Sequence, residues 1–191
     1  MSNHPKLIAV FGAAQSGKST LAEALAENAW IKREKFAAVL YEVLSILIGT
    51  PAEELIEISG AEKETPRPEL CGKSIRTFLQ LLGTEFGRDM IGPDLWANAI
   101  IPKILRNAQE GLLTVIDDMR FANELRVVRG LDGLVVRVTR PGHQVTHTDH
   151  ASEQDWQTFG HDFELISETV GQIRETGVQQ VLAKFQTHFA R

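Results

Sequence analysis

A glycine-rich loop between an apolar run and a helical pattern constrains this chain more than any other feature. Residues 6–11 form a short aliphatic run that is typical of a buried strand. The run leads directly into Gly12-Ala-Ala-Gln-Ser-Gly-Lys-Ser-Thr20, and apolar residues at near-helical spacing follow up to residue 30. This is the pattern G-x-x-x-x-G-K-[ST] in its required context of strand, loop and helix. The segment therefore predicts a phosphate-binding loop, against the alternative of a chance glycine turn.

The residue types of this loop suit a nucleoside triphosphate. Gly12 and Gly17 permit backbone angles at which successive N–H groups converge on phosphate oxygens. The positive end of the following helix dipole strengthens that anion site. Lys18 is placed to reach the β- and γ-phosphates, Ser19 to ligate Mg²⁺, and Thr20 to contact the α-phosphate region.

A second apolar run, residues 112–116, ends in Asp117 and Asp118. In proteins with such a loop, an Asp on a neighbouring strand holds the Mg²⁺ ion. Side chains alternate along a strand, so only one of the two carboxylates can face the phosphates. We assign the metal site to Ser19 and Asp117, while the choice between Asp117 and Asp118 stays open. The alternative is a strand that simply ends in a polar turn.

The middle of the chain predicts a helix over residues 74–83 with two distinct faces. Its apolar residues, Ile75, Phe78, Leu79 and Leu82, follow the i, i+3, i+4, i+7 pattern of a buried face. Arg76, Gln80 and Gly83 fall together on another face, which suits either a bound ligand or a solvated polar surface. Residues 83–88 are expected to end the helix, with Arg88 as a further arginine there.

The segments around this helix are predicted from local signals. An apolar helix is expected over residues 36–48, a new helix after Pro51 and a loop over residues 59–72. Pro93 is expected to start a further helix, which Pro102 splits around residue 101. Trp96, near the start of that helix, can either stack on a base or cap the core.

The end of the second strand carries another polar group of residues. Asp118 and Arg120 lie two positions apart, and Glu124 follows one turn into the next helix. Open α/β sheets bind ligands at the carboxyl ends of their strands. These side chains are therefore candidates for holding a base or sugar, unless Asp118 only caps the helix.

Towards the C-terminus, strands are expected over residues 134–138 and 163–167, with a final helix that contains Ile173 and Phe185. Between the strands, His143, His147 and His150 follow Arg140. Three histidines can suggest a metal, but no cysteine or tight carboxylate pattern accompanies them, so we favour a polar lid-like loop over about residues 140–153.

Charge and composition exclude several classes of protein. The chain of 191 residues has a formal net charge of −5, so it has no overall attraction for a nucleic acid polymer or a membrane surface. Its only cysteine, Cys71, excludes an intramolecular disulfide. No apolar run approaches the roughly 20 residues of a membrane span, and residues 1–6 show no signal peptide. We expect a cytoplasmic protein.

Four segments together resemble the bacteriophage deoxynucleoside monophosphate kinases, which belong to the P-loop nucleoside monophosphate kinase group. They are GAAQSGKST (12–20), LQLLGTEFGRDMIGPDLW (79–96), IDDMRFANE (116–124) and HASE (150–153). The resemblance spans about residues 6–167 and is far more specific than the glycine loop alone. It implies the host cytoplasm as the location if a phage or prophage encodes the chain.

The resemblance also implies roles for individual residues. ATP would bind to Gly12, Ala13, Ala14, Gln15, Ser16, Gly17, Lys18, Ser19 and Thr20. The deoxynucleotide would contact Arg76, Gly83, Trp96, Asp118, Arg120 and Glu124, and the predicted polar face adds Gln80. Lys18 and two mobile arginines, Arg88 and Arg140, would stabilise charge on the transferring phosphoryl group, with Mg²⁺ as the cofactor.

We therefore predict one three-layer α/β kinase domain over residues 1–191, with a mainly parallel sheet and a helical acceptor-binding insertion at about 35–110. The predicted reaction transfers the γ-phosphoryl group of ATP to a dNMP, and its partners are these two small molecules. Homodimerisation is left open. The alternatives are another small-acceptor kinase, of the phosphomevalonate or dephospho-coenzyme A type, and a non-kinase ATPase or regulatory module.

Overall fold

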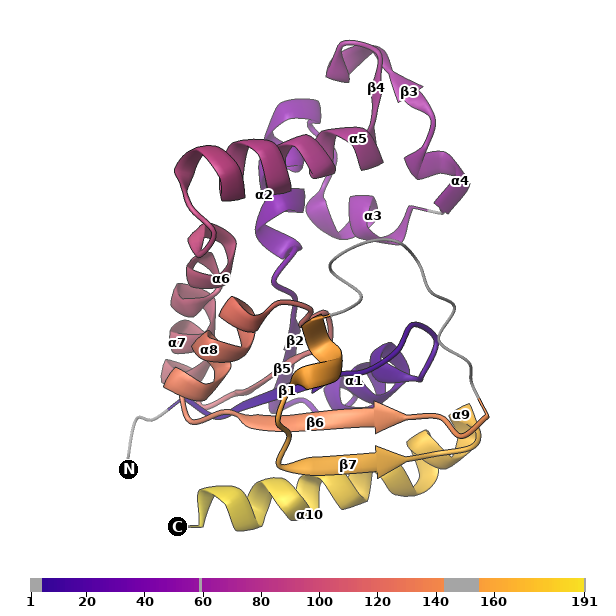
Figure 1. Ribbon diagram of the computed structural model, residues 1–191, viewed down its shortest axis with the longest axis vertical. Helices are drawn as coiled ribbons and strands as arrows, with labels where there is room; N and C mark the ends of the chain where they lie inside the picture. Colours follow the sequence, from indigo (N-terminus) through magenta and orange to yellow (C-terminus); the bar gives the residue numbers. More distant parts are fainter. Residues whose placement is uncertain (1–4, 59, 143–154, 191) are drawn as a thin grey trace. The chain divides into compact units, whose positions relative to one another are not determined.

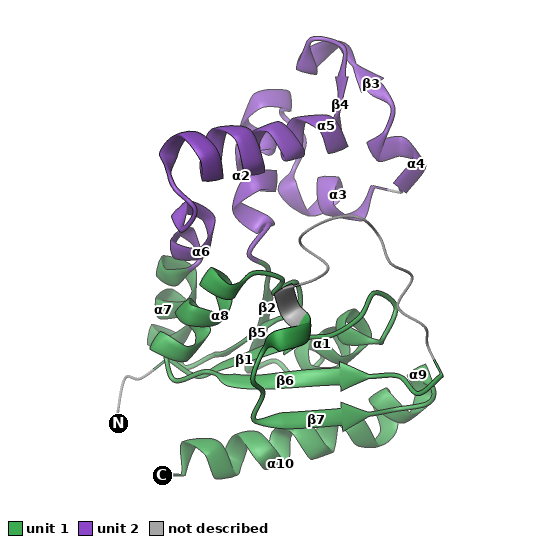
Figure 2. Ribbon diagram, in the orientation of Figure 1, with its two compact units in different colours: residues 1–35, 101–191 green, residues 36–100 purple. Residues whose placement is uncertain are grey.

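The computed structural model describes residues 5–58, 60–142 and 155–190. The chain divides into two compact units (Figures 1 and 2), one of residues 1–35 and 101–191 and the other of residues 36–100. The histidines 143, 147 and 150, and most of the predicted lid-like loop, lie outside the described residues. Among the described residues, no helix is both long and apolar enough to cross a membrane.

The first unit is built on a five-stranded sheet in which all neighbouring strands are parallel. Its strand order is β2-β5-β1-β6-β7. The strands are β1 (Leu7–Phe11), β2 (Ile31–Glu34), β5 (Leu113–Ile116), β6 (Leu134–Thr139) and β7 (Phe163–Ile166). Strands β1 and β5 are buried along their whole length, which explains their continuous apolar sequences.

Helices cover both faces of this sheet, which confirms the predicted three-layer α/β fold. On one face, α1 (Lys18–Ala26) and α10 (Val178–Phe189) share a core with Ile8 and Val10 of β1. Leu7 points to the other face and lies near Val128 of α8 (Ala122–Gly130), while α7 (Ile101–Gln109) contacts β5. Two short elements, α9 (Val170–Gln172) and the π-helix η5 (Ile173–Gly177), lead into α10.

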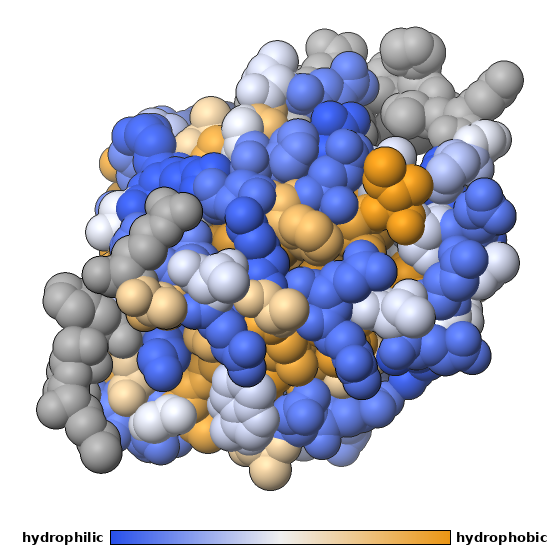
Figure 3. Space-filling view, turned by 90° about the horizontal axis from the view of Figure 1, so that it is seen from below, coloured by the Kyte–Doolittle hydropathy of each residue, from blue (hydrophilic) through white to orange (hydrophobic). Residues whose placement is uncertain are grey.

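One further element of this unit is a short 3-10 helix, and strand β2 is the strand of the sheet that the sequence did not predict. The 3-10 helix η4 covers Asp155–Thr158. Strand β2 was missed because three of its four residues are Lys32, Arg33 and Glu34, a composition that masks its pairing with β5. The face of the molecule seen from below, in Figure 3, is mainly hydrophilic, with hydrophobic residues between the hydrophilic ones.

The second unit is mostly helical and has its own core of Leu44, Leu55, Leu70 and Ile75. Its helices are α2 (Ala38–Ile48), α3 (Ala52–Glu57), α4 (Gly60–Lys63), the 3-10 helix η1 (Pro68–Leu70), α5 (Ile75–Gln80), the π-helix η2 (Leu81–Ile91) and α6 (Leu95–Ala99). The predicted break at Pro102 is confirmed, because α6 ends at Ala99 and α7 begins at Ile101.

Two predictions for the second unit were wrong. The expected loop over residues 59–72 contains α4, η1 and strand β3 (Pro66–Arg67), which pairs with β4 (Lys73–Ser74). Left-handed backbone at Cys71 and Gly72 closes that hairpin. The expected helix end within residues 83–88 was also wrong, since α5 continues without a break into η2, which stops at Ile91.

Gly83 and Gly87 serve as a packing surface in η2. The indole N–H of Trp96 donates a hydrogen bond to the Gly83 carbonyl (2.9 Å). A Cβ atom at position 87 would lie 2.1 Å from Trp96 Nε1, so the indole packs directly on the glycine backbone. Trp96 is only 9% exposed as a result.

Candidate active site

The glycine loop connects the end of β1 to the start of α1 in a conformation that needs both of its glycines. Gly12 has a φ of +145°, and a Cβ there would lie 2.3 Å from the Val138 carbonyl oxygen of β6. Gly17 has a φ of +103°, and its Cβ would lie 2.3 Å from Ile173 Cδ1. The loop is therefore fixed by the strand and helix packed behind it, with the uncapped N-terminus of α1 at its end.

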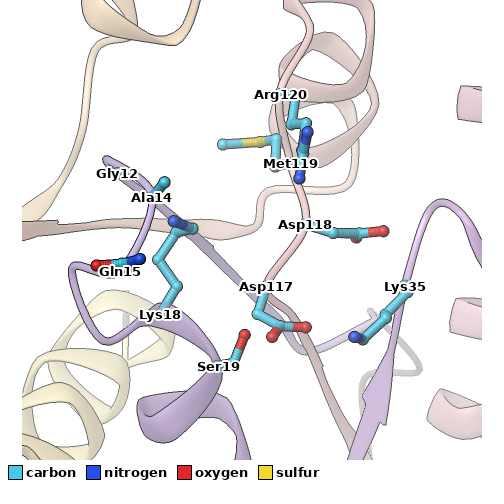
Figure 4. Close-up of a pocket in the computed structure, with 10 residues that line it drawn as sticks. All are labelled: Gly12, Ala14, Gln15, Lys18, Ser19, Lys35, Asp117, Asp118, Met119 and Arg120. Atoms are coloured by element: carbon cyan, nitrogen blue, oxygen red, sulfur yellow. The ribbon is translucent and has the colours of Figure 1, made fainter. Parts of the chain in front are cut away.

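A pocket of about 300 Å³ lies beside this loop within the first unit. Figure 4 shows that its walls come from the loop, from the end of β2 and from the segment after β5. The lining residues are Gly12, Ala14, Gln15, Lys18, Ser19, Lys35, Asp117, Asp118, Met119 and Arg120. The topology thus brings together predicted phosphate-binding, metal-binding and base-binding residues from distant parts of the sequence.

Lys18 is the first residue of α1, and its side chain returns across the loop. Its ammonium group donates a hydrogen bond to the carbonyl oxygen of Ala13. Ser19 presents its hydroxyl on the Asp117 side of the pocket (Figure 4). Ser16 is different, because its hydroxyl is buried inside the loop and has no hydrogen-bond partner among the described residues.

Asp117 is held by an arginine that the sequence analysis did not single out. Arg33 of β2 donates from Nη2 to Asp117 Oδ2 (2.7 Å) and from Nε to Oδ1 (3.3 Å). Its Nη1 also pairs with Glu23 of α1 (3.1 Å). Asp117 is buried at the end of β5, and this two-pronged contact fixes both of its oxygens in one orientation.

The charge of Arg33 is secured by the same contacts. Burial on its own lowers the pKa of this guanidinium, whereas the hydrogen bonds and negative charge of Asp117, followed by those of Glu23, raise it. The net effect is a pKa above the ordinary arginine value. Arg33 therefore keeps its positive charge beside Asp117 at neutral pH.

The residues after β5 diverge as the sequence predicted. Figure 4 shows the Asp117 carboxylate on the Ser19 side and the Asp118 carboxylate pointing away from it. Glu124, buried in the first turn of α8, does not line the pocket. Its Oε2 accepts hydrogen bonds from the backbone N–H groups of Arg120 (2.6 Å) and Phe121 (3.0 Å). Glu124 thus shapes the turn that carries Arg120.

The predicted site residues of the second unit lie in α5, η2 and α6. Arg76 and Gln80 are exposed, and Arg76 pairs with Glu64. Gly83 is buried beneath Trp96, so these three residues do not form one continuous exposed face. Arg88 is half-buried in η2. In the first unit, Arg140 donates to the Glu168 carbonyl (3.2 Å) at the end of β6.

The chain is similar in sequence to known proteins. A family model described as deoxynucleotide monophosphate kinase matches residues 69–168. A protein of Acanthamoeba polyphaga mimivirus, named as a candidate deoxynucleotide monophosphate kinase, is 29% identical over 171 residues, which cover 84% of this chain and 88% of that protein. The deoxynucleoside-5'-monophosphate kinase of Escherichia phage T5 is 34% identical over 86 residues, which cover 42% of this chain and 34% of the phage protein.

Proposed function

Because the chain belongs to the deoxynucleotide monophosphate kinase family, we propose that it transfers the γ-phosphoryl group of ATP to a deoxynucleoside monophosphate. The products are ADP and a deoxynucleoside diphosphate. The observation that carries this proposal is the pocket in Figure 4, where Ser19 and Asp117 lie on the same side and the Lys18 side chain returns across the glycine loop. The predicted ATP-binding residues Gly12–Thr20 form that loop and the first turn of α1.

The oxygen ligands of the pocket fit the proposed Mg²⁺ ion. The ion prefers octahedral oxygen ligands and is bound by one or two carboxylates together with water and substrate phosphates. Ser19 and Asp117 supply a hydroxyl and a carboxylate on the same side of the pocket. The described residues contain no cluster of three His, Cys, Asp or Glu side chains for a metal, and this ion needs none. Bound with ATP, it would neutralise charge on the β- and γ-phosphates.

The reaction requires alignment and charge neutralisation more than covalent chemistry by the protein. An oxygen of the acceptor phosphate forms a bond to the γ-phosphorus as the bond between that phosphorus and the β,γ-bridging oxygen breaks. The electron pair stays on ADP. The acceptor oxygen is already an anion at neutral pH, so no general base is required. Lys18 contributes positive charge from the loop, and we assign the same task to Arg88 and Arg140.

Recognition of the acceptor is proposed for residues of both units. In the first unit, Arg120 lines the pocket with Asp118, and Glu124 holds the turn between them and α8. In the second unit, Arg76 and Gln80 offer exposed donors. Trp96 is buried against η2, so its contribution to the proposed dNMP site would come chiefly from positioning Gly83 and Gly87.

An assay of ADP release across a panel of acceptors tests this function. The panel contains the four common dNMPs, the matching NMPs and mevalonate phosphate, each offered with ATP and Mg²⁺. We expect ADP release to depend on a dNMP and to yield one dNDP for each ADP. Lys18→Ala is the inactive control. ADP release that is independent of any acceptor would identify an ATPase, and selective use of mevalonate phosphate would identify a different kinase.

A further inference from the structure

Lys35 is a pocket residue for which neither the motifs nor the proposed reaction has yet given a role. It directly follows β2, and its ammonium group points into the pocket from the side opposite the glycine loop (Figure 4). Glu34 pairs with Ile116 in the parallel register of β2 and β5, so Lys35 lies beside Asp117 in the next position. The pairing of two strands places this lysine at the site.

The surroundings of Lys35 leave its charge available for a ligand. Its side chain is half-buried, and within residues 5–58, 60–142 and 155–190 it forms no hydrogen bond or ion pair. The neighbouring Asp117 carboxylate is already neutralised by Arg33 on both oxygens. A half-buried ammonium group with three donors favours an anionic partner, because removing its charge from water is costly.

The order of the strands indicates which anion this is. The glycine loop and Lys18 lie at the end of β1, Asp117 lies at the end of β5, and Lys35 lies at the end of β2. Adjacent strands are about 4.8 Å apart, so β1 and β2 are separated by about 10 Å across β5. That separation places Lys35 beyond the position of the γ-phosphate if ATP lies on the loop.

In-line transfer requires the attacking oxygen on the side of the γ-phosphorus that faces away from ADP. The acceptor phosphate therefore belongs on the β2 side of the pocket. We propose that Lys35 binds the phosphate group of the acceptor, an inference that rests on the proposed function. In this arrangement Lys18 holds the donor phosphates at one end of the pocket and Lys35 holds the acceptor phosphate at the other.

Steady-state kinetics of two Lys35 variants and one matched control test the proposal. Lys35→Gln removes the charge, Lys35→Arg keeps it, and Lys32→Gln removes an exposed charge from the same strand. The acceptor is whichever dNMP the wild-type protein uses best. We expect Lys35→Gln to raise the KM for the dNMP by about tenfold or more, as for loss of a hydrogen bond to a charged group. The KM for ATP should stay within about twofold of wild type.

The charge-keeping variant, the matched control and a binding measurement separate binding of the acceptor phosphate from other roles of Lys35. Lys35→Arg should recover most of the dNMP affinity, and Lys32→Gln should match wild type. Calorimetric titration of the same dNMP without ATP should show the same loss of affinity in Lys35→Gln as the kinetics. Thermal unfolding of each variant checks that the fold is intact, and Lys35→Met, which also removes the charge, provides the test if Lys35→Gln does not fold.

Three results would overturn the proposal while the wild-type protein remains an active kinase. They are an unchanged KM for the dNMP in Lys35→Gln, an equal rise in the KM for ATP, and a fall in kcat at constant KM. The last would mean that Lys35 acts on the transferring group instead. A wild-type protein that phosphorylates no dNMP would instead reject the proposed function, and the assignment of Lys35 with it.

Discussion

At the scale of single residues, the contact between Arg33 and Asp117 connects the stability of the sheet to the geometry of the pocket. Asp117 is buried and forms an ion pair with Arg33. The arginine side chain is 24% exposed. The pair joins the edge strand β2 to β5 and, through Glu23, to α1. The residue that orients the candidate metal ligand therefore also ties three elements together.

Arg33→Met should destabilise the protein, because it leaves the Asp117 charge buried without its partner. Loss of one member of a fully buried pair costs about 3–5 kcal/mol, and the partial exposure of Arg33 reduces our expectation to about 2 kcal/mol. Urea unfolding of the variant measures this change. The double variant Arg33→Met/Asp117→Leu should recover most of the loss, since it leaves no unpaired charge. A change below about 0.5 kcal/mol in the single variant would contradict this account.

Lys18→Ala should abolish phosphoryl transfer and leave the fold intact. The loop conformation depends on Gly12 and Gly17, whose contacts do not involve the Lys18 ammonium group. The expected loss in kcat is at least ~10²-fold, by comparison with other preorganised electrostatic contacts. ADP release and circular dichroism of the variant measure the two effects. Near-normal turnover in the folded variant would remove Lys18 from the mechanism.

At the scale of elements, the π-helix η2 depends on how closely Trp96 approaches its glycines. π-Helices are usually a single turn, but η2 extends over Leu81–Ile91. Gly83 provides the carbonyl that accepts the indole N–H, and Gly87 provides the space for the ring. This geometry explains why the two glycines of the predicted helix end, residues 83–88, lie inside a helix instead.

Gly87→Ala should destabilise the protein by about 1–3 kcal/mol, because the added methyl group collides with the indole of Trp96. Gly60→Ala is a matched control in the same unit, since nothing lies within 4 Å of a Cβ at that position. Thermal or urea unfolding compares the two variants. In a Trp96→Phe background the cost of Gly87→Ala should fall, as a double-mutant cycle would show. Equal stability of Gly87→Ala and Gly60→Ala would contradict the packing described here.

At the scale of the whole molecule, the sequence predicted what depends on local patterns. The strand β1, the glycine loop and the strand β5 were recognised because continuous apolar runs and fixed motif spacing identify them. Arg33 and Lys35 were missed because their importance arises from the pairing of β2 with β5. Arg33 and Asp117 are 84 residues apart, and no local pattern relates them. The signal available in the sequence was the charged segment 32–35, which follows the β-branched Ile31.

In the second unit, too, local sequence patterns predicted only some of the elements. Its helices α2 and α3 were predicted from an apolar pattern and a helix-start signal, and both are present. The short hairpin of β3 and β4 was not predicted, because strands of two residues leave no periodicity in the sequence. The face of Arg76, Gln80 and Gly83 was predicted from regular helical spacing, and the change from α5 to η2 alters that spacing at Leu81.

Asp162 links the acid stability of the protein to the packing of its sheet unit. It precedes β7, accepts a hydrogen bond from the Val135 N–H of β6 (2.8 Å) and pairs with Arg129 of α8. Burial raises the pKa of this carboxyl, but the bond from Val135 and the pair with Arg129 outweigh it and lower the pKa below the ordinary value. The unfolded chain therefore binds this proton at a higher pH than the folded protein does.

The lowered pKa of Asp162 means that its contribution to stability is present above the unfolded-state pKa of about 3.9 and is lost as the pH falls through the folded-state value. We expect Asp162→Asn to lower the unfolding free energy at neutral pH and to make it less dependent on pH below about 4.5. Asp89→Asn, at an exposed position in η2, is the control and should retain the wild-type dependence. Urea unfolding from pH 7 to 3 measures all three proteins. If the unfolding free energies of Asp162→Asn and wild type fall in parallel over that range, the contacts of the Asp162 carboxylate with β6 and α8 do not contribute to the pH dependence of stability.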